Sequence, residues 1–401
     1  MEFGFSTGDE AFRDEVVAFA QAALPADWGV RAAGINPFEQ STEGEGAGGE
    51  AWELMRGFQS KLAQRGWLAL AWPEEHGGAG VSFVRQALFT ETMAELRAPV
   101  YNQGIDRVGP TIMRYGLPEQ KARLLPPIRD GSVFFCQGFS EPGAGSDLAS
   151  AQTRAVRDGD DYVINGQKIW TSYAHRAERM FLLARSDPEA PKHKGLSYFI
   201  LEMDTPGITV KPLVDLAGRH HFNEVFFEDV RVPAANRIGE ENGGWYAAAT
   251  SLDFERSGIY RVVGAIRTLH ELTALAKQPG PYGRRPADND LVRHKLAELH
   301  IEFAAGRLLA YRVASLLDAG EPLGNAASVS KLFGSELQQR LAGMLNLVGL
   351  AGQLSAGSEW APLEGRLAYE YQIGVQLTIA AGTSEIQRNI VATRGLGLPR
   401  V

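Results

Sequence analysis

The first third of the chain carries apolar residues at the spacing of an amphipathic helix. Phe12, Val16 and Phe19 recur every three to four positions, and this pattern ends at Pro25. Two acids precede it, where the partial positive charge of a helix N-terminus favours them. The same periodicity predicts helices over 52–66, 83–96 and 104–115, and the proline pair at 126–127 is expected to break the pattern.

The period changes from about residue 133. Short runs rich in β-branched and aromatic residues replace the helical pattern and predict strands. The runs are 153–156, 162–164, 180–184, 197–203, 208–210 and 223–232. Asp158-Gly159-Asp160 and Asn165-Gly166 separate runs in the way that hairpin turns do. The middle of the chain is therefore predicted to be an antiparallel β domain.

Long helical patterns resume after Pro233 and predict an antiparallel bundle of four helices. They cover roughly 243–277, 288–318, 325–353 and 361–394. The predicted fold class is α+β: an N-terminal α-helical domain (1–132), a middle β-barrel-like domain (133–236) and a C-terminal four-helix bundle (237–401). Two or three domains also suit a chain of 401 residues.

Composition narrows the class of protein. The formal charge of −8 leaves no excess of Lys and Arg to neutralise phosphates, so no nucleic-acid partner is expected. No run approaches the ~20 apolar residues that span a membrane, and no N-terminal stretch resembles a signal peptide. The single cysteine, Cys136, excludes an internal disulfide and favours a small buried residue. We therefore expect a cytoplasmic protein without a membrane partner.

The densest local signal is Phe139–Asp147 (FSEPGAGSD), which directly follows an apolar run. Its glycines and proline predict a tight loop with accessible backbone N–H groups, and Ser140 and Ser146 add hydroxyl donors. Such a loop suits a flat polar ligand packed against backbone, although a surface turn is the alternative.

The second signal is Asn165–Ser172 (NGQKIWTS). It places Trp170 beside the hydroxyls of Thr171 and Ser172, so that the indole can cover one face of an aromatic cofactor while the hydroxyls bond its edge. Taken alone, a tryptophan is more often a core residue.

Together the two motifs resemble the acyl-CoA dehydrogenase family, whose middle domain carries a hydroxyl residue followed by EPxxGSD and then NGxKxW followed by a hydroxyl residue. Two further stretches resemble the family's N- and C-terminal signatures, Trp67–Gly80 and Gly382–Arg388. The resemblance spans nearly the whole chain. It implies the three-domain fold predicted above, an acyl-CoA substrate, FAD as cofactor, electron-transfer flavoprotein as electron acceptor and an oligomeric enzyme.

The resemblance also assigns cofactor contacts. Phe139 and Ser140 are expected at the isoalloxazine, Trp170 against the flavin with Ser172 at its polar edge, and Thr383 and Glu385 near the adenosine half or the pyrophosphate. The further cofactor residues that it implies are Gln137, Thr171, Asn346 and Gly349.

Two departures from the family concern the contacts between subunits. Asn346 stands where the family has the Gln of a Gln-x-x-Gly-x-x-Gly loop that binds a neighbouring subunit's FAD. Pro279–Gly283 replaces an Arg-x-x-Phe-Gly segment whose Arg reaches the neighbour's FAD; Arg284 or Arg285 is a candidate substitute. These departures leave both a homo-oligomer and a hetero-oligomer with a paralogous subunit open.

The catalytic base is expected at Glu255. Many members place the base immediately before the Gly-Thr of the C-terminal motif, but that residue is Ala381 here. A minority carry the base on the first long helix of the C-terminal domain, which Glu255 resembles. Asp253 and Arg256 would shape the substrate pocket, with Ser146 near the substrate. In an arbitrary protein, Glu255 beside Arg256 would be read as a solvated ion pair.

Three functions remain open at this point. The first is the dehydrogenase, in the version that takes branched or bulky acyl groups; Tyr173, Trp245 and Tyr246 also resemble actinobacterial members that act on sterol-derived side chains. The second is a flavin-dependent oxidase or monooxygenase on the same scaffold. The third is one subunit of a heteromeric acyl-CoA dehydrogenase. The pair His220-His221 is read as a surface or subunit contact, because no further metal-ligand spacing accompanies it.

Overall fold

The structure is a computed structural model that describes residues 4–31, 47–256, 259–280, 283–344, 353–354 and 358–399; side chains at 30–31, 47–48, 253–256 and 261 lie outside that description. The described chain forms two compact units, each built from separate segments and each treated by itself below. Unit 1 comprises 1–40, 81–99 and 256–401, and unit 2 comprises 41–80 and 100–255.

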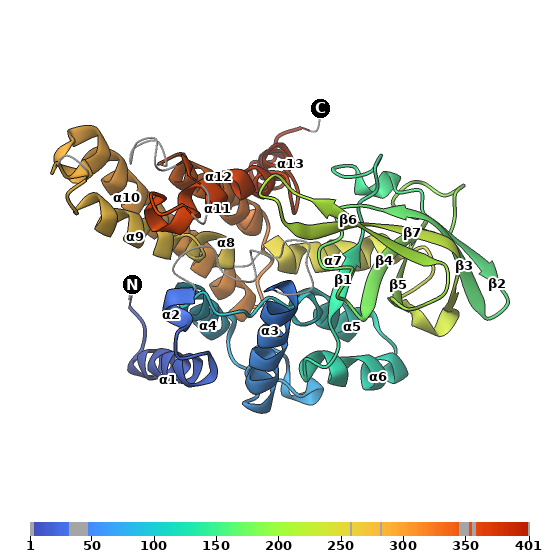
Figure 1. The fold of residues 1–401 in the computed structure, drawn as a ribbon. Helices are drawn as coiled ribbons and strands as arrows, with labels where there is room; N and C mark the ends of the chain where they lie inside the picture. The colour runs from blue at the N-terminus through green and yellow to red at the C-terminus, as the bar shows by residue number, and fades with distance from the viewer. Residues whose placement is uncertain are drawn as a thin grey trace. The chain divides into compact units, whose positions relative to one another are not determined.

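Unit 2 holds the sheet and four of the described helices (Figure 1). The helices are α3 (Ala47–Gln64), α5 (Gly109–Tyr115), α6 (Pro118–Arg129) and α7 (Gly244–Arg256), whose last residue falls in unit 1. The strands are β1 (Phe135–Gly138), β2 (Arg154–Asp158), β3 (Asp161–Lys168), β4 (Arg179–Arg185), β5 (Leu196–Glu202), β6 (Ile208–Val214), β7 (His220–Pro233) and β8 (Arg237–Ile238).

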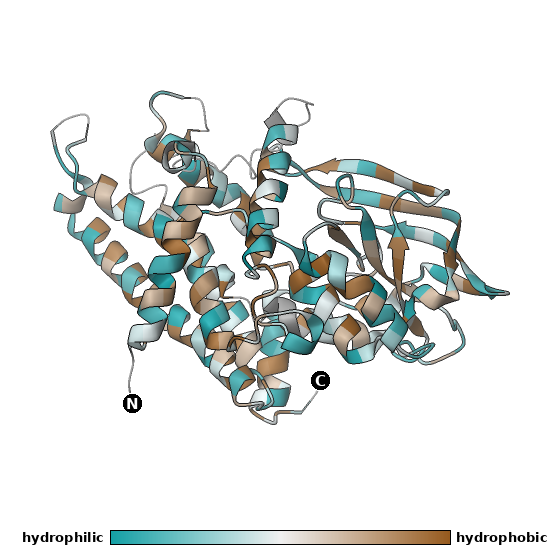
Figure 2. Ribbon diagram, turned by 90° about the horizontal axis from the view of Figure 1, so that it is seen from below, coloured by the Kyte–Doolittle hydropathy of each residue, from teal (hydrophilic) through white to brown (hydrophobic). Residues whose placement is uncertain are grey.

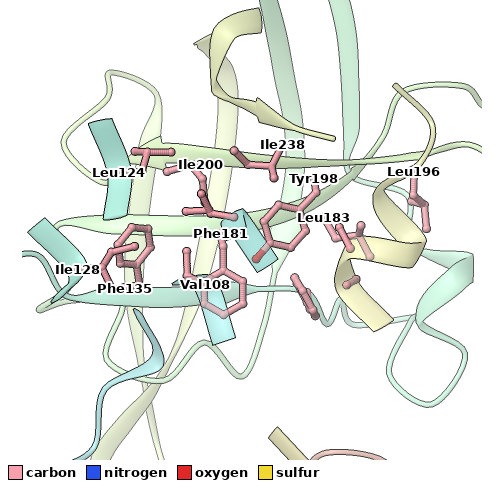
Figure 3. Packing of buried hydrophobic residues seen from close by; sticks show 14 of the residues in the cluster. Val108, Leu124, Ile128, Phe135, Phe181, Leu183, Leu196, Tyr198, Ile200 and Ile238 are labelled. Atoms are coloured by element: carbon pink, nitrogen blue, oxygen red, sulfur yellow. The ribbon is translucent and has the colours of Figure 1, made fainter. Parts of the chain in front are cut away.

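The sheet follows the order β6-β7-β3-β2-β4-β5-β8, with β1 beside β4. Most pairings are antiparallel as predicted, but β1 and β2 each pair with β4 in parallel. Its inner face packs into one apolar core with α5, α6 and the π-helical turn Gly104–Val108 (Figure 3). Figure 3 labels the main contributors: Val108, Leu124, Ile128, Phe135, Phe181, Leu183, Leu196, Tyr198, Ile200 and Ile238.

The described part of unit 1 contains helices joined by turns, and no strand. Its helices are α1 (Thr7–Ala23), α2 (Trp28–Arg31), α4 (Phe83–Glu95), α8 (Tyr260–Val263), α9 (Ile266–Ala276), α10 (Asp290–Asp318), α11 (Ala326–Ala342), α12 (Arg366–Leu377) and α13 (Ser384–Ile390). Hydrophobic and hydrophilic residues alternate around the long helices (Figure 2), as amphipathic helices require. Their apolar faces meet in a second core that includes Val262, Leu269, Phe303 and Leu337.

The Asn165-Gly166 turn was wrongly predicted. The pair lies inside β3, where the register against β7 shifts between Ile164 and Gly166. Asn165 bridges the two strands, because its side chain donates to Asp229 Oδ1 at 3.0 Å and accepts from the Asp229 amide at 2.9 Å. Gly166 has φ +147°, and a Cβ there would come within 2.8 Å of Thr153 Cα. The irregularity places two residues of β7, Glu228 and Asp229, opposite Asn165 alone, while the predicted turn at 158–160 does join β2 to β3.

The predicted helix break at Pro126-Pro127 was also wrong. α6 runs through both prolines to Arg129. The proline carbonyls still accept from the amides of Asp130 and Ser132, at 2.9 and 3.1 Å, so the last turn keeps its bonds.

Two of the four long C-terminal helices are interrupted. The first is divided between α8, which ends at Val263, and α9, which begins at Ile266, while 257–258 between α7 and α8 lie outside the described residues; the last is divided into α12 and α13. Ala381 and Gly382 separate α12 from α13 with φ values of 55° and 85°, which an α-helix cannot contain. The domain ranges 1–132, 133–236 and 237–401 remain a prediction, since the compact units divide the chain differently.

Candidate functional site

The loop after β1 is held by a buried ion pair within unit 2. Lys168, at the end of β3, is fully buried and donates to Glu141 Oε1 at 2.7 Å and to the Phe139 carbonyl at 2.9 Å. Glu141 also accepts from the amides of Gln152 and Thr153, at 2.6 and 2.8 Å. Burial lowers the pKa of Lys168 to about 8, so the ammonium remains charged at neutral pH beside its carboxylate.

A second connection ties this loop to the segment that carries the predicted flavin tryptophan. The Ile169 amide donates to the Ser140 carbonyl at 2.9 Å. Ser140 is half-buried and Phe139 is buried, with its ring edge-on to Phe181 at 5.4 Å between centroids. The structure thus brings Phe139 and Ser140 next to the segment 169–173.

Trp170 and its neighbours have the properties of a binding surface for a flat ring. Trp170 is 60 % exposed and has φ 60°, in the left-handed region that a non-glycine residue rarely adopts. Thr171 is fully buried, and its Oγ1 has no hydrogen-bond partner among the described residues. Ser172 is half-buried. An exposed indole beside an unsatisfied buried hydroxyl fits an aromatic ligand with a polar edge.

Of two further residues predicted for the site, one precedes the loop after β1 in the chain and the other lies within that loop. Gln137 is half-buried in β1, and Arg107 Nη1 donates to its Oε1 at 3.4 Å. Ser146 is exposed in the loop, followed by Asp147, which pairs with Lys192 at 2.8 Å.

Glu255 lies near the C-terminal end of α7, with Asp253 and Arg256 beside it; the side chains of all three are outside the described residues. The helix face that leads to position 255 is buried. Ala247, Ala248 and Ser251 are at most 1 % exposed, and Ser251 lies one turn before position 255 on that face. Ser251 Oγ is 2.7 Å from Thr111 Oγ1, so α7 is joined to α5 by a buried hydroxyl pair.

The predicted adenosine-side residues belong to unit 1. Thr383 caps α13 by accepting from the Ile386 amide at 3.2 Å, and Thr383 and Glu385 line an open hollow of about 570 Å³. The other lining residues come from α11, from α13 and from the turn between α12 and α13: Glu336, Gln339, Arg340, Thr378, Ile379, Ser384 and Arg388. Hydrogen bonds from its own amide and from Thr383 hold the pKa of Glu385 below its ordinary value.

Asn346, Gly349 and two of the five residues of the segment 279–283 cannot be placed in the site, since 345–352 and 281–282 lie outside the described residues. Sequence reasoning assigned no role to Lys168, Glu141 or Asn223. A signal existed for Lys168, because it shares the inward face of β3 with Tyr162 and Ile164. The predicted turn at 165–166 concealed that alternation.

Comparison with known proteins covers the same three regions. The N-terminal, middle and C-terminal domain models of acyl-CoA dehydrogenase match residues 6–132, 136–230 and 242–396. The chain belongs to the acyl-CoA dehydrogenase family. It is thus an oxidoreductase of a family of flavoproteins, and its helical, β-sheet and helical regions follow the family's order.

Several acyl-CoA dehydrogenases of Mycobacterium tuberculosis are similar over most of their length. FadE26 is 40% identical over 351 residues, which are 85% of this chain and 87% of that protein. IpdE1 is 39% identical over 362 residues, 89% of this chain and 91% of that protein.

Two solved structures whose names each join two different chains are also similar to this chain. "Tcur3481-Tcur3483 steroid ACAD" has a TM-score of 0.87 at 35% identity and covers 100% of both chains. The ChsE4-ChsE5 complex from Mycobacterium tuberculosis has a TM-score of 0.86 at 34% identity, again over 100% of both chains.

Two further findings concern membrane spans and metal-ion sites. In the part of the chain that the structure describes, no helix has the length and apolar character to cross a membrane. The described residues include no group of three or more His, Cys, Asp or Glu placed to hold a metal ion.

Proposed function

We propose that this acyl-CoA dehydrogenase desaturates an acyl-CoA thioester between its α and β carbons, with FAD as cofactor and Glu255 as the base. The observation that carries the proposal is the segment 169–173: an exposed Trp170 beside the buried, unsatisfied Thr171 hydroxyl, held against Phe139 and Ser140. FAD, when bound, supplies the acceptor for the β-hydride at flavin N5.

The role of the chain's own residues follows from the chemistry of the α-proton. A free carboxylate is too weak a base for it, but burial raises a carboxyl pKa, and hydrogen bonds to the thioester carbonyl stabilise the developing enolate. Position 255 lies one helical turn beyond Ser251, the last side chain of the buried face of α7 that is described. Ala381 has only a methyl group at the alternative position. Ser146, Asp253 and Arg256 are proposed to bind the substrate.

The lining of the hollow in unit 1 is an argument for assigning it to the adenosine end of the cofactor. Glu385 carries a carboxylate with a lowered pKa, which would accept hydrogen bonds from ribose hydroxyls and would repel a pyrophosphate. Arg388 and Arg340 line the same hollow, and each is already paired with a glutamate, Glu336 and Glu302. We therefore assign Thr383 and Glu385 to the adenosine half, and Gln137, Phe139, Ser140, Trp170, Thr171 and Ser172 to the isoalloxazine half.

The substrate class and the partner follow from the similar proteins. Two similar structures are named for two different chains each, and one of them is described as a steroid ACAD. Together with the helix-borne base, this similarity favours a bulky, sterol-derived acyl group as substrate and a hetero-oligomer with a paralogous subunit. Asn346 and Gly349, from the loop that serves a neighbouring subunit in the family, would then complete the partner's FAD site. Electron-transfer flavoprotein is the proposed acceptor.

The test is a panel of acyl-CoA thioesters, straight-chain, branched and sterol-derived, assayed with an artificial electron acceptor on the flavin-loaded protein. Glu255→Gln should lower turnover by about 10²- to 10⁴-fold, the usual contribution of a general base, with retained flavin absorbance. Glu119→Gln, an exposed position on α6, is the matched control and should keep full turnover.

Two outcomes would contradict the proposal. Near-normal turnover of Glu255→Gln would refute the base assignment. Rapid reoxidation of the reduced flavin by O₂, without turnover of any thioester, would favour the oxidase instead.

A further inference from the structure

The segment Trp170–Tyr173 is strained at both ends. Trp170 has φ 60° and Tyr173 has φ 57°, and neither residue is a glycine. The left-handed region is unfavourable for a residue with a side chain, so the conformation persists only where neighbouring groups hold it. The residues that hold this conformation also fix the backbone of Trp170, whose indole is 60 % exposed.

The first residues of β7 impose it. The Thr171 amide donates to the Asn223 carbonyl at 3.0 Å, and the Tyr173 amide donates to the His221 carbonyl at 3.0 Å. The Asn223 side chain is fully buried, and its Nδ2 donates to the Thr171 carbonyl at 3.0 Å. Asn223 thus binds both backbone polar groups of the residue that follows Trp170.

Two histidines orient the Asn223 side chain. His220 Nε2 lies 2.8 Å from Asn223 Oδ1, and His175 Nδ1 lies 3.2 Å from that oxygen and 3.1 Å from Asn223 Nδ2. The two imidazoles stack on each other at 4.0 Å between centroids and 22° between planes. Burial lowers the pKa of His175 to about 4, so it is neutral at pH 7. With the oxygen directed to His220, the amide nitrogen faces the Thr171 carbonyl and His175 Nδ1, and its two N–H groups suffice for both.

We propose that Asn223 is a positioning residue that holds Trp170 in place for the flavin. The two hydrogen bonds between Asn223 and the Thr171 backbone form a clamp. This clamp fixes the backbone on one side of Trp170, while the Ile169–Ser140 hydrogen bond fixes the other. An indole that is already ordered loses less entropy when a ring stacks on it, which favours binding. The flavin part of this inference rests on the proposed function, but the clamp itself does not.

The test follows Trp170 directly. The protein has seven tryptophans, and 5-fluorotryptophan labelling gives each a ¹⁹F resonance; the one lost in Trp170→Phe belongs to Trp170. In Asn223→Ala, recorded without flavin, we expect that resonance to shift or broaden while the other six stay in place. The dissociation constant for FAD should rise about tenfold, as the loss of one hydrogen bond of ~1.4 kcal/mol predicts.

Two further variants keep the test decisive. Asn223→Asp preserves the side-chain volume but replaces the donor with a carboxylate oxygen facing the Thr171 carbonyl, so it should move the Trp170 resonance even if the alanine variant folds poorly. Asn165→Ala is the matched control, because Asn165 also bridges two strands through its amide, to Asp229 instead of the segment 169–173.

An unchanged Trp170 resonance in both Asn223 variants would overturn the proposal. So would a change that is equal in all seven resonances, because it would show a general structural role. If the wild type binds no FAD, the proposed function fails, and the flavin-free Trp170 resonance still decides on the clamp.

Discussion

At the scale of single residues, the pair Lys168–Glu141 links the two motifs that the sequence singled out. Lys168 Nζ bonds Glu141 and the Phe139 carbonyl, and Glu141 accepts two backbone amides on the far side of the loop. Removing one partner of a buried pair leaves an uncompensated charge, which costs far more than the pair itself contributes.

Lys168→Met is therefore expected to lower the free energy of unfolding by about 3–5 kcal/mol and to weaken FAD binding. Urea denaturation of the flavin-free protein measures the first effect. Glu141→Gln with Lys168→Met removes both charges, so the double variant should be more stable than the sum of the single changes predicts. Strict additivity would show that the two side chains do not act as a pair.

At the scale of elements, the position of α7 depends on a glycine. α7 begins at Gly244, and a Cβ there would lie 2.5 Å from Ser197 C and 2.7 Å from the Tyr198 amide nitrogen of β5. The backbone of β5 cannot yield as a flexible side chain would. The helix that carries Glu255 is thus seated on the sheet by close backbone contact.

Gly244→Ala should push the start of α7 away from β5, lower stability by ~1–3 kcal/mol through overpacking and reduce turnover through the displaced base. Thermal denaturation and the thioester assay measure the two effects. Gly57→Ala on α3 is the control, since a Cβ at this position would have no atom within 4 Å apart from its chain neighbours and the backbone of its own helix; it should keep turnover and gain up to ~1 kcal/mol of stability. Equal behaviour of the two variants would contradict the seating of α7.

At the scale of the whole molecule, the proposed FAD residues are divided between unit 2, which holds Phe139–Ser172, and unit 1, which holds Thr383 and Glu385. The family departures at 279–283 and Asn346 concern contacts that a neighbouring subunit's FAD would use. A chain with those departures is expected to depend on a different subunit to complete its cofactor sites.

The chain purified alone is therefore expected to hold less than one FAD per chain, and co-expression with a paralogous acyl-CoA dehydrogenase chain should raise the ratio. Flavin absorbance after denaturation, with the mass of the assembly, gives both numbers. One FAD per chain in a stable assembly of this chain alone would refute the hetero-oligomer.

The sequence by itself determined the order of helical, β and helical regions and the two loop motifs. These features depend on hydrophobic periodicity and turn residues, which act over a few neighbouring positions. It also identified the family, through motifs spread along the chain, and Ala381 at one of the two base positions. Trp170, Glu255 and Thr383 remain predictions in their roles, because bound cofactor and substrate would test them.

Only the tertiary structure decided the rest. Asn165-Gly166 lies inside β3 because β7 pairs with it on both sides, and Ala381-Gly382 interrupts a predicted helix. The partners of Lys168 and Asn223 lie 27 and 52 positions away, at Glu141 and Thr171. Contacts at such separations arise only when the strands assemble. No local pattern therefore revealed that buried polar groups hold the loop Phe139–Asp147 and the segment 169–173 in place.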